Sequence, residues 1–340
     1  MHVLVLTFHR AWNYGALLQA WSLKTWLERQ NIQCFFANLP ELRQSHRLVD
    51  KIAASPLIWF SKHKLSAQKE VVISGNEVHW PDCDAYIVGS DQVWNPKITR
   101  THSQLYFFKG LDAEKIISYA ASFGESQWVI DPVETKYVAS LLHRFSSISL
   151  REQSGLDLLW KHIGLRGELV LDPTLMNGDF SPLIFSTHPT KSYVAAYKFC
   201  QDASFFEFMK AVGREIKAVP KILNSILPHD GICGGGFLSP EKLVTHIGTS
   251  KFFITDSFHG VCCAILQRRN FAAFIANPNR KGRITSLLDQ LGLENRIFES
   301  YKEAWDKKIW TQEIDYSAVY QRLVPLQQQS RDYLIKALKG

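Results

Sequence analysis

Short apolar runs alternate with helical patterns through the first half of the chain. Between residues 15 and 29, apolar residues recur at helical spacing, from Leu17 to Leu27. The short runs are nearly continuous in apolar residues, which is typical of parallel strands buried on both faces. They lie at Val3–Phe8, Gln33–Leu39, Ala85–Gly89, Ile116–Ala121, Ser147–Leu150 and Leu169–Asp172. The alternation predicts a parallel sheet wrapped by helices.

The same alternation resumes after residues 177–190, a polar stretch with Gly178, Pro182 and Pro189 that predicts a linker. The second half predicts strands at Tyr193–Tyr197, Ile216–Val219, Phe252–Thr255 and Phe271–Ile275, with helices at Pro240–Gly248, Gly260–Gln267, Ile284–Leu291 and Tyr316–Leu338. We therefore expect an α/β fold with two Rossmann-like, doubly wound domains facing a cleft, with ligands at the carboxyl ends of strands. The domains are predicted at 1–176 and 190–315, and the helix at 316–340 is expected to pack back on the first domain.

Composition narrows the class of ligand and the compartment. The chain has 340 residues, with 39 Lys and Arg against 32 Asp and Glu, and the formal net charge of +7 favours an anionic partner. No run of five like charges occurs, which disfavours nucleic acid. The six cysteines lack zinc-type spacing, so we expect no metal and a reducing cytoplasm. The first residues resemble a buried strand, and no apolar run approaches the roughly 20 residues of a membrane span, so a soluble chain is expected.

The turn after the predicted strand Phe252–Thr255 has the residues of an anion site. It reads Thr255-Asp256-Ser257-Phe258-His259-Gly260 and leads into an apolar helical stretch. A strand, a polar turn and a helix N-terminus direct backbone N–H groups toward an anion. His259 adds an imidazole that can bind phosphate or act as a general acid. A histidine that only caps the helix or bonds a neighbouring carbonyl is the alternative.

A second turn follows the predicted strand Ala85–Gly89. Ser90, Asp91 and Gln92 can bond sugar hydroxyls, and Trp94 can stack on a sugar face. The alternative is a structural turn in which Asp91 caps the next segment and Trp94 belongs to the core.

A third turn, after the first predicted strand, contains Asn13, Tyr14 and Gly15. It occupies the place of a glycine-rich ligand loop but has one glycine, so nicotinamide dinucleotide binding is disfavoured. Gly15 either contacts a ligand or simply starts the helix.

Several cations follow strands. Arg151 comes directly after the predicted strand Ser147–Leu150, and a guanidinium suits a small dianion; an Arg151–Glu152 structural pair is the alternative. Arg280, Lys281 and Arg283 follow the last strand of the second half, where they either close the same anion site or form a solvated loop. Lys198 is a further cation near a strand end.

Taken in order, six motifs closely resemble the polysaccharide pyruvyl transferase family. They are N-Y-G-A-x-L-Q-A from Asn13, V-G-S-D-Q-V-W-N from Val88, S-Y-A-A-S-F-G at 118–124, S-L-R-E-x-S from Ser149, L-D-P-T from Leu171 and T-D-S-F-H-G from Thr255. The resemblance implies a fold like the two-domain GT-B glycosyltransferases. It also implies transfer of pyruvate from phosphoenolpyruvate (PEP) to two hydroxyls of a sugar in a polysaccharide or its lipid-linked precursor, giving a cyclic ketal and phosphate.

The resemblance also implies roles for individual residues. His259 corresponds to the family's PEP-binding histidine and acid, and Arg151 to an arginine that binds the PEP anion. Ser257 stands where some members carry a basic residue, which leaves part of the phosphate recognition to Arg283, Lys198 or backbone N–H groups. The predicted PEP-binding residues are thus Arg151, Ser257, His259, Gly260, Arg283 and Lys198, and no cofactor besides the donor is expected.

On the acceptor side, we expect Asp91 to orient or deprotonate a hydroxyl. The predicted acceptor-binding residues are Asn13, Tyr14, Gly15, Ser90, Asp91, Gln92 and Trp94. A lipid-linked acceptor would place the chain at the inner face of a bacterial membrane. Lys62, Lys64 and the apolar residues 57–60 either make that peripheral contact or form an amphipathic surface helix.

Two other functions remain open on the sequence alone. A GT-B glycosyltransferase that uses a nucleotide sugar would bind a nucleotide diphosphate and ignore PEP. A non-catalytic glycan-binding protein would release no phosphate from PEP with any glycan.

Overall fold

The structure, a computed structural model, describes residues 1–39, 48–184, 191–275 and 282–340. The described residues of Met1–Arg47, Ile58–Asn177 and Pro325–Gly340 form one compact unit, unit 1. Those of Leu48–Leu57 and Gly178–Val324 form a second, unit 2. Residues 185–190 of the predicted linker lie outside the described residues.

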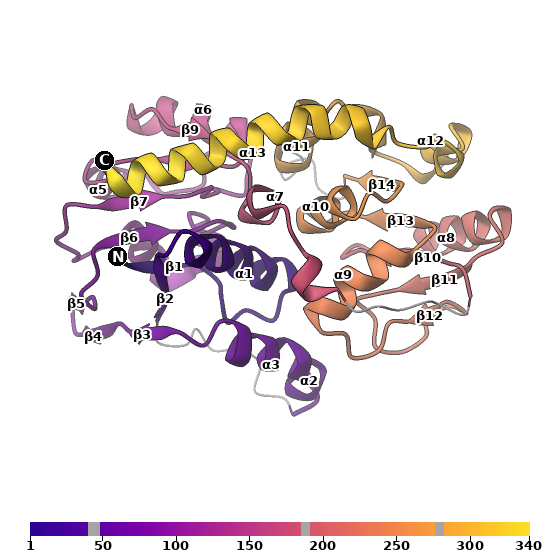
Figure 1. Cartoon of the computed structure of the whole chain (residues 1–340), viewed down its shortest axis with the longest axis horizontal. Coiled ribbons are helices and arrows are strands. Elements are labelled where there is room, and N and C mark those ends of the chain that lie inside the picture. Colours follow the sequence, from indigo (N-terminus) through magenta and orange to yellow (C-terminus); the bar gives the residue numbers. More distant parts are fainter. Residues whose placement is uncertain (40–47, 185–190, 276–281) are drawn as a thin grey trace. The chain divides into compact units, whose positions relative to one another are not determined.

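Unit 1 is built on a parallel sheet of five strands in the order β3-β2-β1-β6-β7. The strands are β1 (His2–Leu6), β2 (Gln33–Asn38), β3 (Gln68–Glu70), β6 (Ala85–Val88) and β7 (Ile116–Ser118) (Figure 1). Every residue of β6 is buried, as the apolar run predicted for a strand covered on both faces. A short parallel pair, β8 (Ser149–Leu150) and β9 (Glu168–Leu169), continues beyond β7 through single bridges. The hairpin of β4 (Val72–Ser74) and β5 (Glu77–His79) is separate from this sheet.

Helices cover the unit 1 sheet. They are α1 (Tyr14–Arg29), α4 (Pro96–Thr99), the 3₁₀ helix η1 (Arg100–Phe107), α5 (Pro132–Leu142), α6 (Gln153–Ile163) and α7 (Pro173–Asn177), with α3 (Ser55–Lys64) beginning in unit 2 and ending in unit 1. The long helix α13 (Tyr316–Lys339) belongs to unit 1 from Pro325 onward. There, Tyr333 Oη donates to Ser118 O at 3.0 Å and Gln327 Nε2 to Leu175 O at 2.7 Å, which ties the helix to β7 and α7.

Unit 2 contains a parallel sheet of six strands in the order β12-β11-β10-β13-β14-β15. The strands are β10 (Tyr193–Tyr197), β11 (Val219–Ile222), β12 (Cys233–Gly234), β13 (Phe252–Thr255), β14 (Phe271–Phe274) and β15 (Ile297–Phe298). Its helices are α2 (Leu48–Ala53), η2 (Ser181–Leu183), α8 (Ala203–Glu215), α9 (Pro240–Thr249), α10 (Phe258–Leu266), α11 (Gly282–Leu291), η4 (Glu294–Arg296), α12 (Tyr301–Asp306) and η5 (Ile309–Thr311). The central strands β10 and β13 are buried along their whole length.

Two predicted strands were misplaced. The strand predicted at Ile216–Val219 is β11, at Val219–Ile222, because Ile216 caps α8 and Lys217 takes a left-handed φ of 52° that ends the helix. The strand predicted at Leu169–Asp172 is β9, which ends at Leu169. Pro173 follows closely and begins α7, whose first residues Asp172 caps by accepting from Thr174 N at 3.0 Å.

Within the described ranges, every helix is too short or too polar to span a lipid bilayer.

Candidate active site

Polar side chains follow three strands of unit 1, β6, β8 and β9, at the points where those strands end. Ser90 and Asp91 come after β6, Arg151 after β8, and Asp172 shortly after β9. Bridges join Asp91 to Ala121 and Ala121 to Leu150, so these strand ends lie along one edge of the parallel array. The structure therefore brings together Ser90 and Asp91, predicted for the acceptor, and Arg151, predicted for PEP.

Arg151 is the centre of this cluster. Its Nη1 lies 2.9 Å from Asp172 Oδ2 and 3.3 Å from Ser90 Oγ, and its Nη2 lies 3.2 Å from Asp91 Oδ1. Its Nε is 3.8 Å from Glu152 Oε2, so the Arg151–Glu152 pair is present beside the ion pairs with Asp91 and Asp172. Burial alone would lower the pKa of the Arg151 guanidinium, but the carboxylates of Asp91, Asp172 and Glu152 together outweigh it and raise that pKa. Arg151 is therefore a permanently charged, buried cation.

Asp172 has a part in this cluster that the sequence did not predict. Its Oδ2 accepts from Ser90 Oγ at 2.6 Å, and its Oδ1 accepts from Thr174 Oγ1 at 2.7 Å. The available signal was its position directly after an apolar run, in L-D-P-T, where a carboxylate is placed at a strand end.

Asp91 is the most exposed carboxylate of the cluster, because 13% of its side chain is accessible while those of Asp172 and Glu152 are almost fully buried. Its backbone has a φ of 81°, a region that residues other than glycine seldom adopt outside turns and functional sites. Asp91 Oδ1 also accepts from Gln92 N at 2.8 Å. Asp91 therefore combines a left-handed backbone with a partly exposed carboxylate at the edge of the buried cluster.

The other predicted acceptor residues after β6 have structural partners. The Trp94 ring is 1% exposed, stacks on Phe107 at 5.4 Å and donates from Nε1 to Tyr106 O at 3.0 Å. This is the core position that the sequence left open as an alternative, and it does not present the ring to a sugar. Gln92 is half-buried, and its Oε1 accepts from Asn95 Nδ2 at 3.1 Å.

The turn after β1 shows how the first helix begins. Asn13 is the N-cap of α1, and its Oδ1 accepts from Ala16 N at 3.1 Å. Gly15 is buried in the first turn, and burial raises the pKa of the half-buried Tyr14 to about 12. His9, just upstream, stacks on Phe36 at 4.8 Å, and burial lowers its pKa to about 4. His9 is consequently neutral at pH 7.

In unit 2, Asp256 links the ends of β10 and β13. Its carboxylate accepts from Phe199 N at 2.8 Å and Cys200 N at 2.9 Å, and lies 3.3 Å from Lys198 Nζ. The Lys198 and Asp256 side chains are 3% and 1% exposed, so this ion pair is buried. Lys198 Nζ also donates to Cys200 O at 2.5 Å. Lys198, a predicted phosphate ligand, therefore has partners within the protein. Asp256, which was not among the candidate residues predicted from the sequence, holds the residues after β10 close to the end of β13.

His259 lies in the first turn of α10. Ser257 is the N-cap of that helix, and its Oγ accepts from Gly260 N at 3.3 Å. A side chain at Gly260 would place its Cβ 2.4 Å from Thr255 Oγ1, so the turn requires glycine. His259 is 7% exposed, with its ring edge against Phe258 at 5.3 Å. The motif therefore forms the predicted strand, turn and helix N-terminus, where N–H groups and the helix dipole favour an anion.

Among the predicted cations near the last strand, Arg283 is half-buried in the first turn of α11, a helix that packs against α10. Arg280 and Lys281 lie outside the described residues. Within the described part of the chain, no three His, Cys, Asp or Glu side chains are grouped so that they could hold a metal ion.

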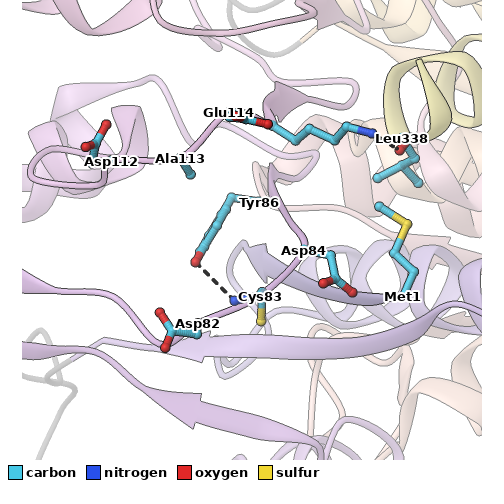
Figure 2. Close-up of a pocket in the computed structure, with 10 residues that line it drawn as sticks. Met1, Asp82, Cys83, Asp84, Tyr86, Asp112, Ala113, Glu114 and Leu338 are labelled. Carbon is cyan, nitrogen blue, oxygen red and sulfur yellow. Dashed lines mark hydrogen bonds between the residues drawn. The ribbon is translucent and has the colours of Figure 1, made fainter.

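A pocket of about 580 Å³ lies at the opposite, amino-terminal edge of the unit 1 sheet (Figure 2). There, Tyr86 Oη accepts from Cys83 N at 3.1 Å, and Lys115 Nζ donates to Leu338 O at 3.0 Å. Its lining includes four carboxylates, those of Asp82, Asp84, Asp112 and Glu114. Such a lining repels an anion, and the pocket lies away from the strand ends that carry Asp91 and Arg151.

The fold is similar to that of several solved structures. The structure of *S. aureus* MnaA with UDP is 11% identical, covers 98% of this chain and 89% of that one, and has a TM-score of 0.53. Putative UDP-N-acetylglucosamine 2-epimerase from *Listeria monocytogenes* is 9% identical over 100% and 91% of the two chains, with a TM-score of 0.53. The *Rickettsia bellii* UDP-N-acetylglucosamine 2-epimerase is 10% identical over 99% and 96%, with a TM-score of 0.52. This likeness confirms the predicted α/β fold with Rossmann-like, GT-B-type domains.

The family follows from the sequence match. The chain belongs to the polysaccharide pyruvyl transferase family, whose model matches residues 13–278 and so spans all six motifs, from Asn13 to Gly260. Membership makes the protein a transferase that acts on polysaccharide. No curated protein sequence matches this chain significantly.

Proposed function

We propose that the protein transfers the enolpyruvyl group of PEP to two hydroxyls of a sugar, in a polysaccharide or its lipid-linked precursor. One hydroxyl oxygen bonds to the central carbon of PEP while the methylene carbon gains a proton and becomes a methyl group. The C–O bond to phosphate then breaks, and the second hydroxyl oxygen bonds to the same carbon. Of the two hydroxyl protons lost, the methyl group accounts for one and inorganic phosphate for the other, so the products are a cyclic ketal and phosphate.

The proposal assigns the donor to the strand ends of unit 2. His259 supplies the proton to the methylene carbon and contacts the phosphate, and the N-terminus of α10 contributes N–H groups. The observation that carries the proposal is the family match across the T-D-S-F-H-G motif, together with the place of His259 in the first turn of a helix that follows a buried strand. Ser257, Gly260 and Arg283 are the nearby proposed contacts to PEP.

The acceptor is assigned to the strand ends of unit 1. Asp91 orients the attacking hydroxyl or takes its proton, and it is the cluster carboxylate with an exposed fraction sufficient to be reached. Asn13, Tyr14, Ser90 and Gln92 remain proposed acceptor contacts. Arg151 remains a proposed ligand of the PEP anion, although its guanidinium is surrounded by carboxylates in this structure.

The donor class can be tested by ligand-dependent thermal stability. A ligand that binds only the folded protein stabilises it by RT ln(1 + [L]/Kd), about 2.7 kcal/mol at a hundred times Kd. We expect PEP to raise the unfolding temperature of the wild-type protein, and UDP, GDP and CMP to leave it unchanged. 3-Phosphoglycerate is the control, because it also carries a phosphate and a carboxylate but lacks the carbon–carbon double bond of the enol phosphate. Stabilisation by UDP with none by PEP would favour a nucleotide-sugar glycosyltransferase, the alternative consistent with the UDP-bound structure of similar fold.

We further propose that the protein works in the cytoplasm and touches the inner face of the membrane through α3. Leu57 and Phe60 are 7% and 0% exposed, whereas the Trp59 side chain, stacked on His63 at 4.4 Å, belongs to a residue that is 50% exposed. Lys62 and Lys64 are also exposed. An exposed tryptophan beside exposed lysines fits an anionic lipid surface.

This contact can be measured by co-sedimentation with phosphatidylcholine vesicles with and without phosphatidylglycerol. Each lysine near an anionic surface contributes about 1 kcal/mol, so Lys62→Glu with Lys64→Glu is expected to weaken binding to the anionic vesicles by roughly tenfold or more. The control pair Lys136→Glu with Lys161→Glu makes the same charge change at exposed positions on α5 and α6. Equal losses in both pairs would show that net charge, and not α3, governs the binding.

A further inference from the structure

In unit 1, Asp172, Arg151 and Asp91 form a chain of contacts that runs from a fully buried carboxylate to a partly exposed one. At one end, Asp172 is held by Ser90 Oγ at 2.6 Å and Thr174 Oγ1 at 2.7 Å. In the middle, Arg151 spans from Asp172 Oδ2 at 2.9 Å to Asp91 Oδ1 at 3.2 Å. The side chains of Asp172 and Arg151 are 0% exposed and that of Asp91 is 13% exposed, so the chain of contacts runs from a buried anchor to a carboxylate that solvent reaches.

The main chains of Asp91 and Arg151 are also held close to each other. Asp91 keeps its left-handed φ of 81° while bridged to Ala121, whose carbonyl also accepts from Arg151 N at 3.2 Å. The main chains of Asp91 and Arg151 are therefore fixed on the same neighbouring segment. An arginine fixed in this way can direct one guanidinium nitrogen at each carboxylate, because its planar group presents its donors in a rigid fork.

We infer that Asp172 is a positioning residue of the transferase reaction: by holding Arg151 it fixes the Asp91 carboxylate for the acceptor hydroxyl. The inference rests on the proposed function, since the hydroxyl belongs to the proposed acceptor. It assigns Arg151 a role that acts through Asp91, in place of the direct contact with PEP proposed above, because the Arg151 side chain is itself 0% exposed. Asp172 itself touches no substrate, because its side chain is fully buried beneath Arg151 and Ser90.

The charged and titratable groups that face Asp91 are few among the described residues. Arg151 contacts it directly, and Asp172 and Glu152 lie beyond the guanidinium. Tyr106 of η1 is also near Asp91. Burial is the larger cause that raises the pKa of the Tyr106 phenol, and the Asp91 charge is the smaller one. Removing the Asp172 charge leaves Arg151 shared between fewer carboxylates. Without the Asp172 contact at 2.9 Å, the guanidinium is no longer held in one position against Asp91 Oδ1.

The kinetic test compares Asp172→Asn in two backgrounds. In the wild-type background we expect kcat to fall about 10- to 100-fold, by comparison with the loss that follows removal of an outer group that orients a metal ligand, with KM for PEP unchanged. In an Asp91→Asn background, the same substitution should cause no further loss. A purely structural residue would instead multiply the two losses, and that result would overturn the inference.

A stability measurement separates this inference from the proposed function. The unfolding temperatures of Asp172→Asn, Asp91→Asn and the double variant should be non-additive, because both residues share Arg151. Thr174→Val, which removes one hydrogen bond to Asp172, gives a milder variant if Asp172→Asn fails to fold, and it should lower kcat less in the same direction. Additive unfolding temperatures would refute the chain of contacts even in an active enzyme. A wild-type protein without PEP turnover but with non-additive temperatures would refute the proposed function and leave the contacts in place.

Discussion

Replacing His259 with alanine is expected to lower kcat for PEP-dependent transfer by about 10²- to 10⁴-fold, the range that a positioned general acid contributes. The substitution removes the proposed proton donor for the methylene carbon. It leaves the N-cap of α10 intact, because Ser257 Oγ accepts from Gly260 N and involves no atom of the imidazole. Steady-state kinetics with PEP and an accepted sugar would measure the effect, with His259→Gln separating hydrogen bonding from proton transfer.

The matched control for His259 is His229→Ala. His229 is also in unit 2 and also has an aromatic neighbour, Phe206, at 4.5 Å, but it is exposed on a loop between β11 and β12. This variant should keep wild-type turnover. Near-wild-type turnover in His259→Ala, with unchanged unfolding temperature, would remove His259 from the proposed chemistry.

Replacing Arg151 with alanine is expected to cause the largest loss of stability of any substitution considered for this protein, about 3–5 kcal/mol, the typical cost of removing one partner from a buried ion pair. Arg151 is 0% exposed and lies between Asp91, Asp172 and Glu152, so its removal leaves three carboxylates in a buried site without their shared cation. Urea unfolding of the variant and of the wild type would measure the difference in unfolding free energy. Activity should be lost as well, because Asp91 loses its anchor.

Arg144→Ala is the control for this stability loss. Arg144 is exposed just after α5 in unit 1, and its removal should change the unfolding free energy by no more than about 0.5 kcal/mol, as for other surface positions. A similar small change in Arg151→Ala would show that the buried charge cluster contributes little and would contradict the role given to Arg151.

The strands that were predicted well are those whose residues are almost all apolar and are all buried. β6, β10 and β13 are completely buried, so their burial is visible in composition alone. The edges of the fold were harder to predict, because β3 at Gln68–Glu70 and the hairpin strand β5 at Glu77–His79 are polar and short. β11 was displaced because the apolar Ile216 that seemed to open it ends α8 instead.

The candidate site likewise has one part that the sequence predicts and one part that it does not. The turn around His259 is a local structure of consecutive residues, so its strand, cap and helix could be predicted from the motif. The cluster around Arg151 joins residues up to 82 positions apart, such as Ser90 and Asp172, and no local pattern carries that pairing. Trp94 illustrates the same limit, since its burial depends on Phe107 and Phe145 from later elements.

We propose PEP as the donor and a sugar ketal as the product. The direct measurement incubates the protein with PEP and a panel of nitrophenyl galactosides, glucosides, mannosides and N-acetylmannosaminides, and follows both free phosphate and the mass of each sugar. The expected result is a sugar that gains one pyruvate with loss of water, with one phosphate released for each ketal formed. Sugar transfer from a UDP-sugar to the same panel, with no phosphate released from PEP, would contradict the claim.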